Sequence, residues 1–213
     1  MNKKKVRLLF IVSLGSAAVA CAAMAFFFKA GTWLFVNDPL PAHLDVLFTF
    51  GGENARVAYS RGLMERIPGA RWVLSDYFHQ YSRILSREGF DMSRVTIIDT
   101  CRYTISEIKG FAAWLKDNKN ALVSSAAAHD TALVRKMPQV HVAFVSSPFH
   151  MRRIKSMAED VFRDTTFHCY YLPVPIERYG WTSGDLRHWW RSKATRTWVA
   201  SETGKLLWYW LFS

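Results

Sequence analysis

Cysteine is scarce in this sequence, and clusters of metal-ligand residues are absent from it. The three cysteines, Cys21, Cys101 and Cys169, lack the spacing of a zinc site, and the seven histidines are scattered. The sequence therefore predicts no metal site and no cofactor. In an oxidising compartment Cys101 and Cys169 could pair, but no spacing demands it, and buried free thiols are the simpler interpretation.

The short motifs that identify many enzymes are also missing. The chain has no G-x-G-x-x-G dinucleotide fingerprint, no P-loop and no G-x-S-x-G nucleophile elbow. No complete set of nucleophile, base and orienting group can be recognised. Motifs alone therefore leave open whether this chain is an enzyme.

Charge is absent from residues 8–28, "LLFIVSLGSAAVACAAMAFFF". At about 1.5 Å per helical residue this segment reaches roughly 30 Å, the thickness of a bilayer's hydrocarbon. It is therefore predicted to be a transmembrane helix. Four basic residues lie within residues 3–7, whereas Lys29 alone follows the segment closely. This imbalance is typical of a cytoplasmic N-terminus with the rest of the chain outside the cytoplasm.

Two alternatives to a retained anchor stay open. A cleaved signal peptide would have a shorter apolar core followed by polar sequence, but here apolar residues continue in "AAMAFFF" and resume in "TWLFV". The segment "AVAC", which ends at Cys21, resembles a lipoprotein box, but Ala18 stands where such boxes favour leucine. Both comparisons favour a retained helix.

The net charge of +11 is divided unevenly along the chain. Residues 1–36 hold five basic and no acidic residues, which leaves +6 on residues 37–213. Because the basic residues of this second part are scattered, nucleic acid is not expected as a partner. An anionic membrane surface or a phosphorylated small ligand fits this mild excess better.

Residues 37–213 begin with a proline-bearing linker (37–43) and then alternate short apolar runs with helical patterns. Strands are predicted at 44–50, 71–75, 94–99, 140–147 and 166–174, and helices at 53–67, 77–88, 105–118 and 148–162. Residues 120–139 fit either a strand fragment and a helix or one irregular helix. Strands that are apolar on both faces and separated by helices indicate a mostly parallel sheet covered on both sides. We therefore expect an N-terminal tip with a transmembrane helix (1–36) and a three-layer, Rossmann-like α/β domain (37–213).

From about residue 185 the pattern changes. One or two predicted helices carry Trp189, Trp190, Trp198, Trp208 and Trp210. Tryptophan favours bilayer interfaces, so these side chains could lean against the membrane. The plainer interpretation is a helix that caps the sheet.

The segment "SSPFHMRR" opens the helix after the fourth predicted strand. Ser147 is the expected N-cap and Pro148 the first helical residue. In open α/β sheets, ligands bind beyond the carboxyl ends of the strands, where a helix N-terminus attracts anions. Capping and solvated charge would explain the segment without a ligand. The residues that would surround an anion here are Ser146, Ser147, His150 and one of Arg152 and Arg153.

Two further corners follow other predicted strands. Gly51 and Gly52 allow close approach of a ligand to the backbone, and the Arg56 side chain points back toward them from the first helical turn. A tight turn alone would also explain these residues. Thr104 and Glu107 have capping-box spacing, which would account for both. Glu107 would also stand at the sheet's carboxyl edge, where a carboxylate facing a histidine could transfer protons or coordinate a cation.

The segments "DVLFTFGGENARVAYSRGLM", "RWVLS", "IIDTCRYTISEI" and "VAFVSSPFHMRRIKSMAEDVF", in this order, resemble the bacterial YdcF-like domain family, which includes SanA and ElyC. The resemblance covers about residues 44–172, with a weaker match at Glu202. It implies Glu107 and His150 as candidate acid or base. The ligand-binding residues that it implies are Gly51, Gly52, Arg56, Thr104, Ser146, Ser147, Arg152 and Arg153.

The same resemblance implies a single-pass protein of the bacterial inner membrane, with its main domain in the periplasm. Such relatives are connected to cell-envelope barrier function and to peptidoglycan or lipid-carrier metabolism. Relatives often have Ser-Gly-Gly after the second strand, where this chain has Ser75, Asp76 and Tyr77. A bulkier loop reshapes the pocket, so the identity of the ligand does not transfer.

Three functions are compatible with these features. The first is a tethered domain that binds an anionic, phosphorylated or lipid-linked envelope precursor, which the anchor keeps at high local concentration. The second is a hydrolase or transferase acting on a phosphoester or lipid-linked glycan, with Glu107 or His150 as acid or base. The third, binding of a nucleotide or S-adenosylmethionine, follows from fold analogy alone and is weakest outside the cytoplasm.

Overall fold

The structure is a computed structural model that describes residues 3–129, 139–163 and 165–212. The chain divides into two compact units: Phe35–Trp181, and a second unit that combines Met1–Leu34 with Thr182–Ser213. The C-terminal helices thus belong to the same compact unit as the N-terminal helix. The sequence instead predicted one boundary, at residue 36.

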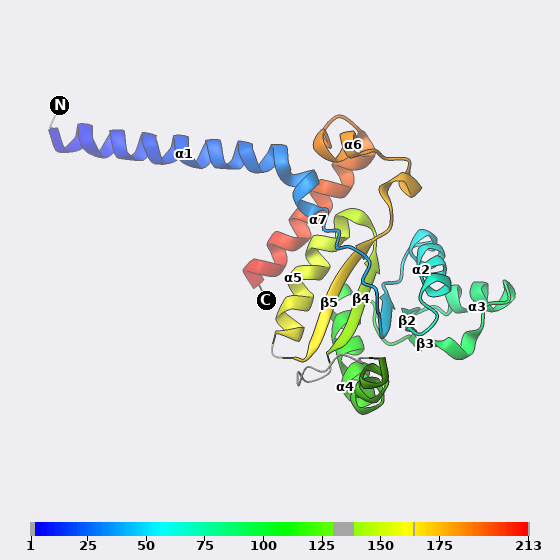
Figure 1. Ribbon diagram of the computed structural model, residues 1–213. Coiled ribbons are helices and arrows are strands. Elements are labelled where there is room, and N and C mark those ends of the chain that lie inside the picture. Colours follow the sequence, from blue (N-terminus) through cyan, green and yellow to red (C-terminus); the bar gives the residue numbers. More distant parts are fainter. Residues whose placement is uncertain (1–2, 130–138, 164, 213) are drawn as a thin grey trace. The chain divides into compact units, whose positions relative to one another are not determined.

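The Phe35–Trp181 unit contains a five-stranded sheet that is parallel throughout (Figure 1). The sheet order is β3-β2-β1-β4-β5. The chain therefore runs outward from β1 to β3 and then returns to place β4 on the other side of β1. This return makes the border between β1 and β4 the topological switch point of the sheet. The strands are β1 (Val46–Thr49), β2 (Arg71–Ser75), β3 (Val95–Ile98), β4 (Val140–Ser146) and β5 (Phe167–Pro173).

Within the described residues, four α-helices connect these strands, together with short 3₁₀ helices at Met92–Arg94 and Pro148–His150. A third 3₁₀ helix, Ile176–Tyr179, follows β5. The α-helices are α2 (Asn54–Arg66), α3 (Gln80–Arg87), α4 (Thr104–His129) and α5 (Met151–Phe162). Helix α4 continues past its predicted end, so the segment left open by the sequence is helical as far as His129. The rest of that segment, 130–138, lies outside the described residues.

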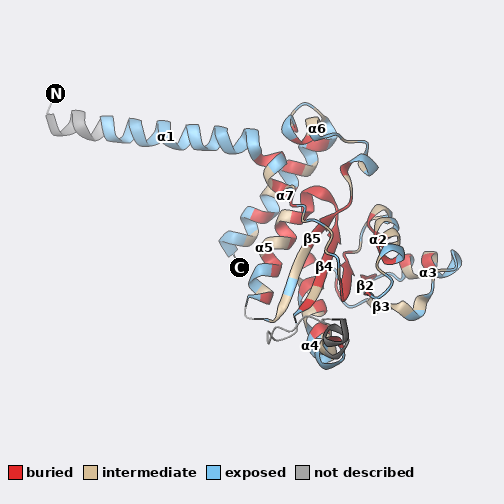
Figure 2. Cartoon of the chain, in the orientation of Figure 1, coloured by how far each residue is buried: buried red, intermediate tan, exposed pale blue. Residues whose placement is uncertain are grey.

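Successive residues of β1 pack against opposite layers. Leu47 is fully buried in a cluster with Leu63 of α2 and Leu85 of α3, whereas the Phe48 ring stacks on Phe111 of α4 at 4.3 Å. The neighbouring strand β4 is buried over most of its length (Figure 2). Fully burying such a side chain contributes about 1.5–3 kcal/mol. On the side of Phe48, α5 adds Phe162 against Phe144 of β4. The predicted α/β class with three layers is thus confirmed.

The cysteines are free thiols in the structure. The Cys101 thiol donates to the Ser106 carbonyl oxygen at 3.1 Å, and burial raises the pKa of Cys169 to about 12. At neutral pH the Cys169 thiol therefore stays protonated and unreactive. The interpretation as free thiols is confirmed over the disulfide.

The second unit consists of α1 (Lys3–Leu34), α6 (Ser183–Arg187) and α7 (Lys193–Phe212). Gly31 permits a close approach of α1 and α6, because a Cβ atom there would lie 2.3 Å from the Leu186 carbonyl oxygen. The Trp189 indole donates a hydrogen bond of 2.8 Å to the Phe27 carbonyl. Helices α6 and α7 thus pack on the C-terminal part of α1.

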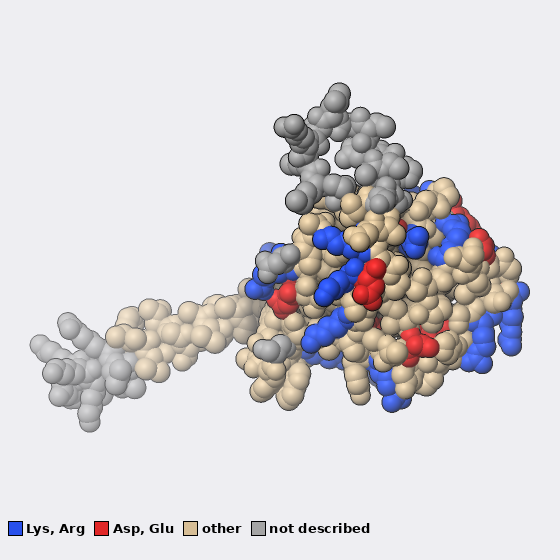
Figure 3. Space-filling view, turned by 90° about the horizontal axis from the view of Figure 1, so that it is seen from below, with Lys and Arg blue, Asp and Glu red and all other residues tan. Residues whose placement is uncertain are grey.

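The segment Phe10–Leu34 of α1 is long and apolar enough to cross a membrane, with a mean hydropathy of 2.1. Most of its side chains are exposed, and its residues 10–28 carry no charge, as the tan stretch of this helix in Figure 3 shows; Lys29 is the one charged residue of the segment. The predicted helix is therefore present, and its length and composition suit a bilayer.

Candidate functional site

The loops that follow β1, β3 and β4 meet at the carboxyl edge of the sheet. The Gly51 amide, after β1, donates a hydrogen bond of 3.2 Å to Glu107 Oε1 on α4. Thr104, one turn earlier on α4, lies 3.2 Å from His150 Nε2, after β4 (Oγ1 to Nε2). The predicted convergence of the three corners is confirmed, while their roles in binding or catalysis stay predictions.

Glu107 lies partly buried against the glycine turn. Burial raises the pKa of its carboxyl group, while hydrogen bonds from the Ser75 hydroxyl and the Gly51 amide, and the nearby charges of Arg56 and Arg153, act in the lowering direction. The turn itself requires glycine, since a Cβ atom on Gly51 would lie 2.7 Å from the Ser75 carbonyl oxygen. The fold thus places a carboxyl group with a raised pKa next to the end of β1.

Arg56 does not face the solvent as a ligand-binding arginine would. Its guanidinium donates hydrogen bonds of 2.9 Å to Glu53 Oε1 and 2.8 Å to Ser147 Oγ, and a third to the Gly51 carbonyl oxygen. The residue is 6% exposed. Arg56 therefore clamps the turn after β1 to the end of β4, and the predicted contact with a ligand would require it to leave these partners.

A second buried group joins α4 to α5. Arg153 donates a hydrogen bond of 2.9 Å to the same Thr104 hydroxyl oxygen that contacts His150. All three residues are at most 9% exposed. Arg152, the next residue on the helix, is half-buried. Of the two predicted arginines, the structure brings Arg153 into this group.

The capping box predicted from Thr104 and Glu107 is wrong. The helix starts one residue earlier than that box requires, because the Glu107 amide donates to the Tyr103 carbonyl at 2.9 Å. Ser106 takes the capping role, because its hydroxyl oxygen accepts a hydrogen bond of 3.1 Å from the Tyr103 amide. The side chains of Thr104 and Glu107 are thus available for contacts beyond their own helix.

The start of the helix after β4 follows the prediction in position but not in side-chain contact. Ser147 is the N-cap and Pro148 the first residue of a 3₁₀ turn that leads into α5. The Ser147 hydroxyl accepts from Arg56 rather than capping the turn. Ser146 Oγ is fully buried and has no hydrogen-bond partner among the described residues. Capping therefore does not explain this serine pair.

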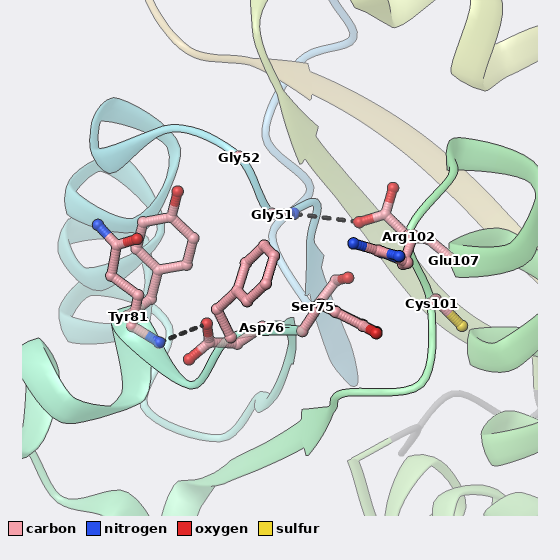
Figure 4. A pocket seen from close by; sticks show the side chains of 11 residues that line it. Gly51, Gly52, Ser75, Asp76, Tyr81, Cys101, Arg102 and Glu107 are labelled. Atoms are coloured by element: carbon pink, nitrogen blue, oxygen red, sulfur yellow. Dashed lines mark hydrogen bonds between the residues drawn. The ribbon is translucent and has the colours of Figure 1, made fainter.

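The open space at this edge is a pocket of about 240 Å³ (Figure 4). Gly51, Gly52 and Glu107 line it, as predicted, whereas the other predicted residues do not. Sequence reasoning missed much of the lining because it took only Thr104 and Glu107 as site residues after β3, and none after β2. The remaining lining residues are Ser75, Asp76, Tyr77, Phe78, Gln80, Tyr81, Cys101 and Arg102.

Asp76 and Arg102, two charged residues of this lining, differ in how far their side chains could contact a ligand. Asp76 caps α3, with its carboxylate accepting from the Gln80 amide at 2.9 Å and from the Ser82 amide at 2.7 Å. Arg102 is exposed and is the single Lys or Arg among the lining residues. Its guanidinium lies 4.8 Å from the centre of the Tyr77 ring. Arg102 is therefore the basic group that a ligand in the pocket would meet first.

The position of this pocket has a physical reason. At the switch point between β1 and β4, where open α/β sheets usually bind ligands, the Arg56–Ser147 hydrogen bond joins the two loops. The chain's own side chains thus occupy that crevice. The open pocket lies instead along the ends of β1, β2 and β3.

No family model, curated protein or solved structure matches the chain. Within residues 3–129, 139–163 and 165–212, no group of three or more His, Cys, Asp or Glu side chains could hold a metal ion. Inference about function therefore rests on the pocket and on the helix that suits a membrane.

Proposed function

We propose that this chain is a membrane-anchored envelope protein of the YdcF, SanA and ElyC type, which binds an anionic or phosphorylated envelope precursor. The observation that carries the proposal is the pocket at the carboxyl edge of the sheet, where Arg102 faces the space beside Gly51, Gly52 and Glu107. Strand ends of a parallel sheet are the usual location of such sites. The expected location is the bacterial inner membrane, with a cytoplasmic N-terminus and a periplasmic main domain.

The charges around the pocket favour an anion over a cation. Arg102 lines the pocket, and Arg56 and Arg153 lie close enough to Glu107 to act on its pKa. Burial shifts Glu107 toward its neutral form, which weakens the repulsion of a bound anion. The carboxylate of Asp76 is compensated by the amides at the start of α3.

Helix α1 supports the link with lipid-bound ligands. Its segment Phe10–Leu34 suits a bilayer, and the basic residues at 3–7 favour a cytoplasmic N-terminus. A domain tethered in this way meets lipid-linked molecules at high local concentration instead of by free diffusion.

Titration of the full-length protein in detergent micelles tests the binding proposal, with inorganic pyrophosphate and farnesyl pyrophosphate as probes. We expect saturable binding that Arg102→Ala weakens about 10-fold or more, since a hydrogen bond to a charged group contributes about 1.5–3 kcal/mol. The matched control is Arg87→Ala, which removes an exposed arginine of α3 outside the pocket lining. Equal losses in both variants, or no binding of either probe, would contradict the proposal.

A hydrolase or transferase acting on a phosphoester or lipid-linked glycan is the second candidate function. Glu107 favours it, because a pocket-lining carboxyl group with a raised pKa suits a general acid or base. His150 is 8% exposed and does not line the pocket, so it fits that role less well.

Release of phosphate from farnesyl pyrophosphate, followed by ³¹P NMR, separates the two functions. Turnover that is lost in Glu107→Gln and kept in Arg87→Ala would establish catalysis. Saturable binding of the same probe without turnover would leave the binding function alone.

A further inference from the structure

Helix α7 has two parts with different surroundings. From Lys193 to Leu206 one face is buried, at spacings of three and four residues that follow the helical repeat. The buried residues are Thr195, Val199, Glu202 and Leu206. This first part is therefore an ordinary amphipathic helix with a covered stripe.

The last six residues of the helix, Leu207–Phe212, form a segment that we call the α7 tail. The tail contains no charged residue, and five of its six side chains are exposed. Their exposed fractions are 45% for Leu207, 66% for Trp208, 51% for Trp210, 73% for Leu211 and 68% for Phe212. A helical segment that is apolar all round is stable when an apolar medium surrounds it.

The tail contacts the helix that suits a bilayer. The Trp210 ring lies 6.0 Å from the Trp33 ring near the end of α1. At the same end of α1, Phe27 and Phe28 are 44% and 48% exposed, and the Phe28 ring lies 5.0 Å from Trp190. The exposed surface of the tail therefore continues an aromatic surface on α1 of the kind that marks membrane interfaces.

Charge on the first part of α7 suits the same environment. Lys193, Arg196 and Lys205 precede the tail, against Glu202 alone, whose carboxylate accepts from Lys205 at 2.8 Å. Basic residues next to a membrane are attracted by anionic headgroups, at about 1 kcal/mol each.

We propose that the α7 tail inserts into the lipid bilayer that α1 crosses, at the boundary between headgroups and acyl chains. Six helical residues measure about 9 Å along the axis, so even a tail that entered end-on would stay within roughly the 5–10 Å to which interfacial helices bury their apolar face. The inference rests on the anchoring role of α1 and is independent of what the pocket binds. The chain would then hold the membrane at two points, by α1 and by the α7 tail.

The environment-sensitive fluorophore NBD, attached to single cysteines in the full-length protein, tests this inference. The protein is reconstituted into vesicles with nitroxide-labelled lipids, in a Cys21→Ala background whose parent serves as the labelling blank. Three positions are compared: Leu211→Cys in the tail, Leu14→Cys in α1, and Ser201→Cys on the exposed side of the first part of α7. Circular dichroism of each variant checks that the fold is retained.

We expect the lipid nitroxides to quench NBD at positions 211 and 14 but not at 201. Quenching at 14 without quenching at 211 overturns the inference while the anchor stands. Quenching at neither overturns both, and quenching at all three shows that α7 as a whole lies in lipid. Absence of lipid quenching at 211, together with a disulfide between two copies when the unlabelled Leu211→Cys protein is oxidised with copper phenanthroline, overturns the inference and assigns the tail to self-association. The pyrophosphate titration is unaffected by any of these results.

Discussion

The hydrogen bonds of Arg56 predict that this residue stabilises the fold, and a single substitution tests this structural role. Arg56→Met keeps most of the apolar stem of the side chain and removes the guanidinium. The buried hydroxyl of Ser147 and the Gly51 carbonyl lose their donor, and the Glu53 carboxylate loses its ion pair at 2.9 Å.

The expected loss follows from these contacts. Breaking a buried ion pair by removing one partner costs about 3–5 kcal/mol. The Glu53 side chain is 22% exposed and still accepts from the Tyr179 hydroxyl at 2.5 Å, so solvent and Tyr179 offset part of the cost. We therefore expect a loss of about 2–4 kcal/mol, which lowers Tm by about 5–15 °C for a chain of this size.

Thermal unfolding of the full-length protein in detergent, followed by circular dichroism, measures this loss. The matched control is Arg61→Met on the same helix, because Arg61 is 34% exposed and its partners Glu65 and Glu88 are 65% and 52% exposed. Surface pairs contribute about 0–1 kcal/mol, so this variant should lose at most a few degrees. A loss for Arg61→Met that equals or exceeds that for Arg56→Met would refute the clamp.

Three further predictions use the same unfolding assay. The raised pKa of Glu107 means that its contribution to stability is present below its ordinary value of 4.5 and is lost as pH rises through the folded-state pKa; Tm of the wild type should therefore fall relative to Glu107→Gln over that range, and parallel curves would contradict this. Gly51→Ala should destabilise the protein by about 1–3 kcal/mol because its Cβ would lie 2.7 Å from a backbone oxygen, whereas Gly62→Ala, with open space around it, should stabilise α2 by about 0.5–1 kcal/mol. Trp72→Phe should cost about 1–3 kcal/mol, since the fully buried indole donates 2.8 Å to Thr49 Oγ1; a neutral result would show that the core repacks.

The strands could be predicted from sequence because each is a short, mainly apolar run bounded by turn residues. The pattern at 140–147 became β4 (Val140–Ser146), and the pattern at 71–75 became β2 with the same ends. The end of α4 could not be predicted, since "ALVSS" has residues of both helix and strand preference. The structure shows that the helix continues to His129.

The edge at which the site lies could also be predicted, but not which residues would face the open pocket. Local rules place Glu107 and His150 at strand ends, yet their exposure depends on what fills the space between the loops. Arg56 reaches Ser147 across 91 positions of sequence, and no local pattern encodes that contact. The rule that ligands bind beyond the carboxyl ends of parallel strands also covers the other residues of the loops after β2 and β3, and it could have identified Arg102.

The division between clamp and pocket changes how the resemblance to the YdcF-like family should be used. Seven of the ten site residues that the resemblance implies do not line the pocket, and Arg56, Thr104 and His150 among them hydrogen-bond other loops. Their hydrogen bonds join the loops at the edge of the sheet, and this structural role is compatible with many ligands. The lining includes Ser75, Asp76, Tyr77 and Arg102, and Asp76 and Tyr77 stand where the proposed relatives often have glycine. Ligand specificity should therefore change with substitutions at Tyr77 and Arg102, whereas substitutions at Arg56 and Thr104 should change stability first.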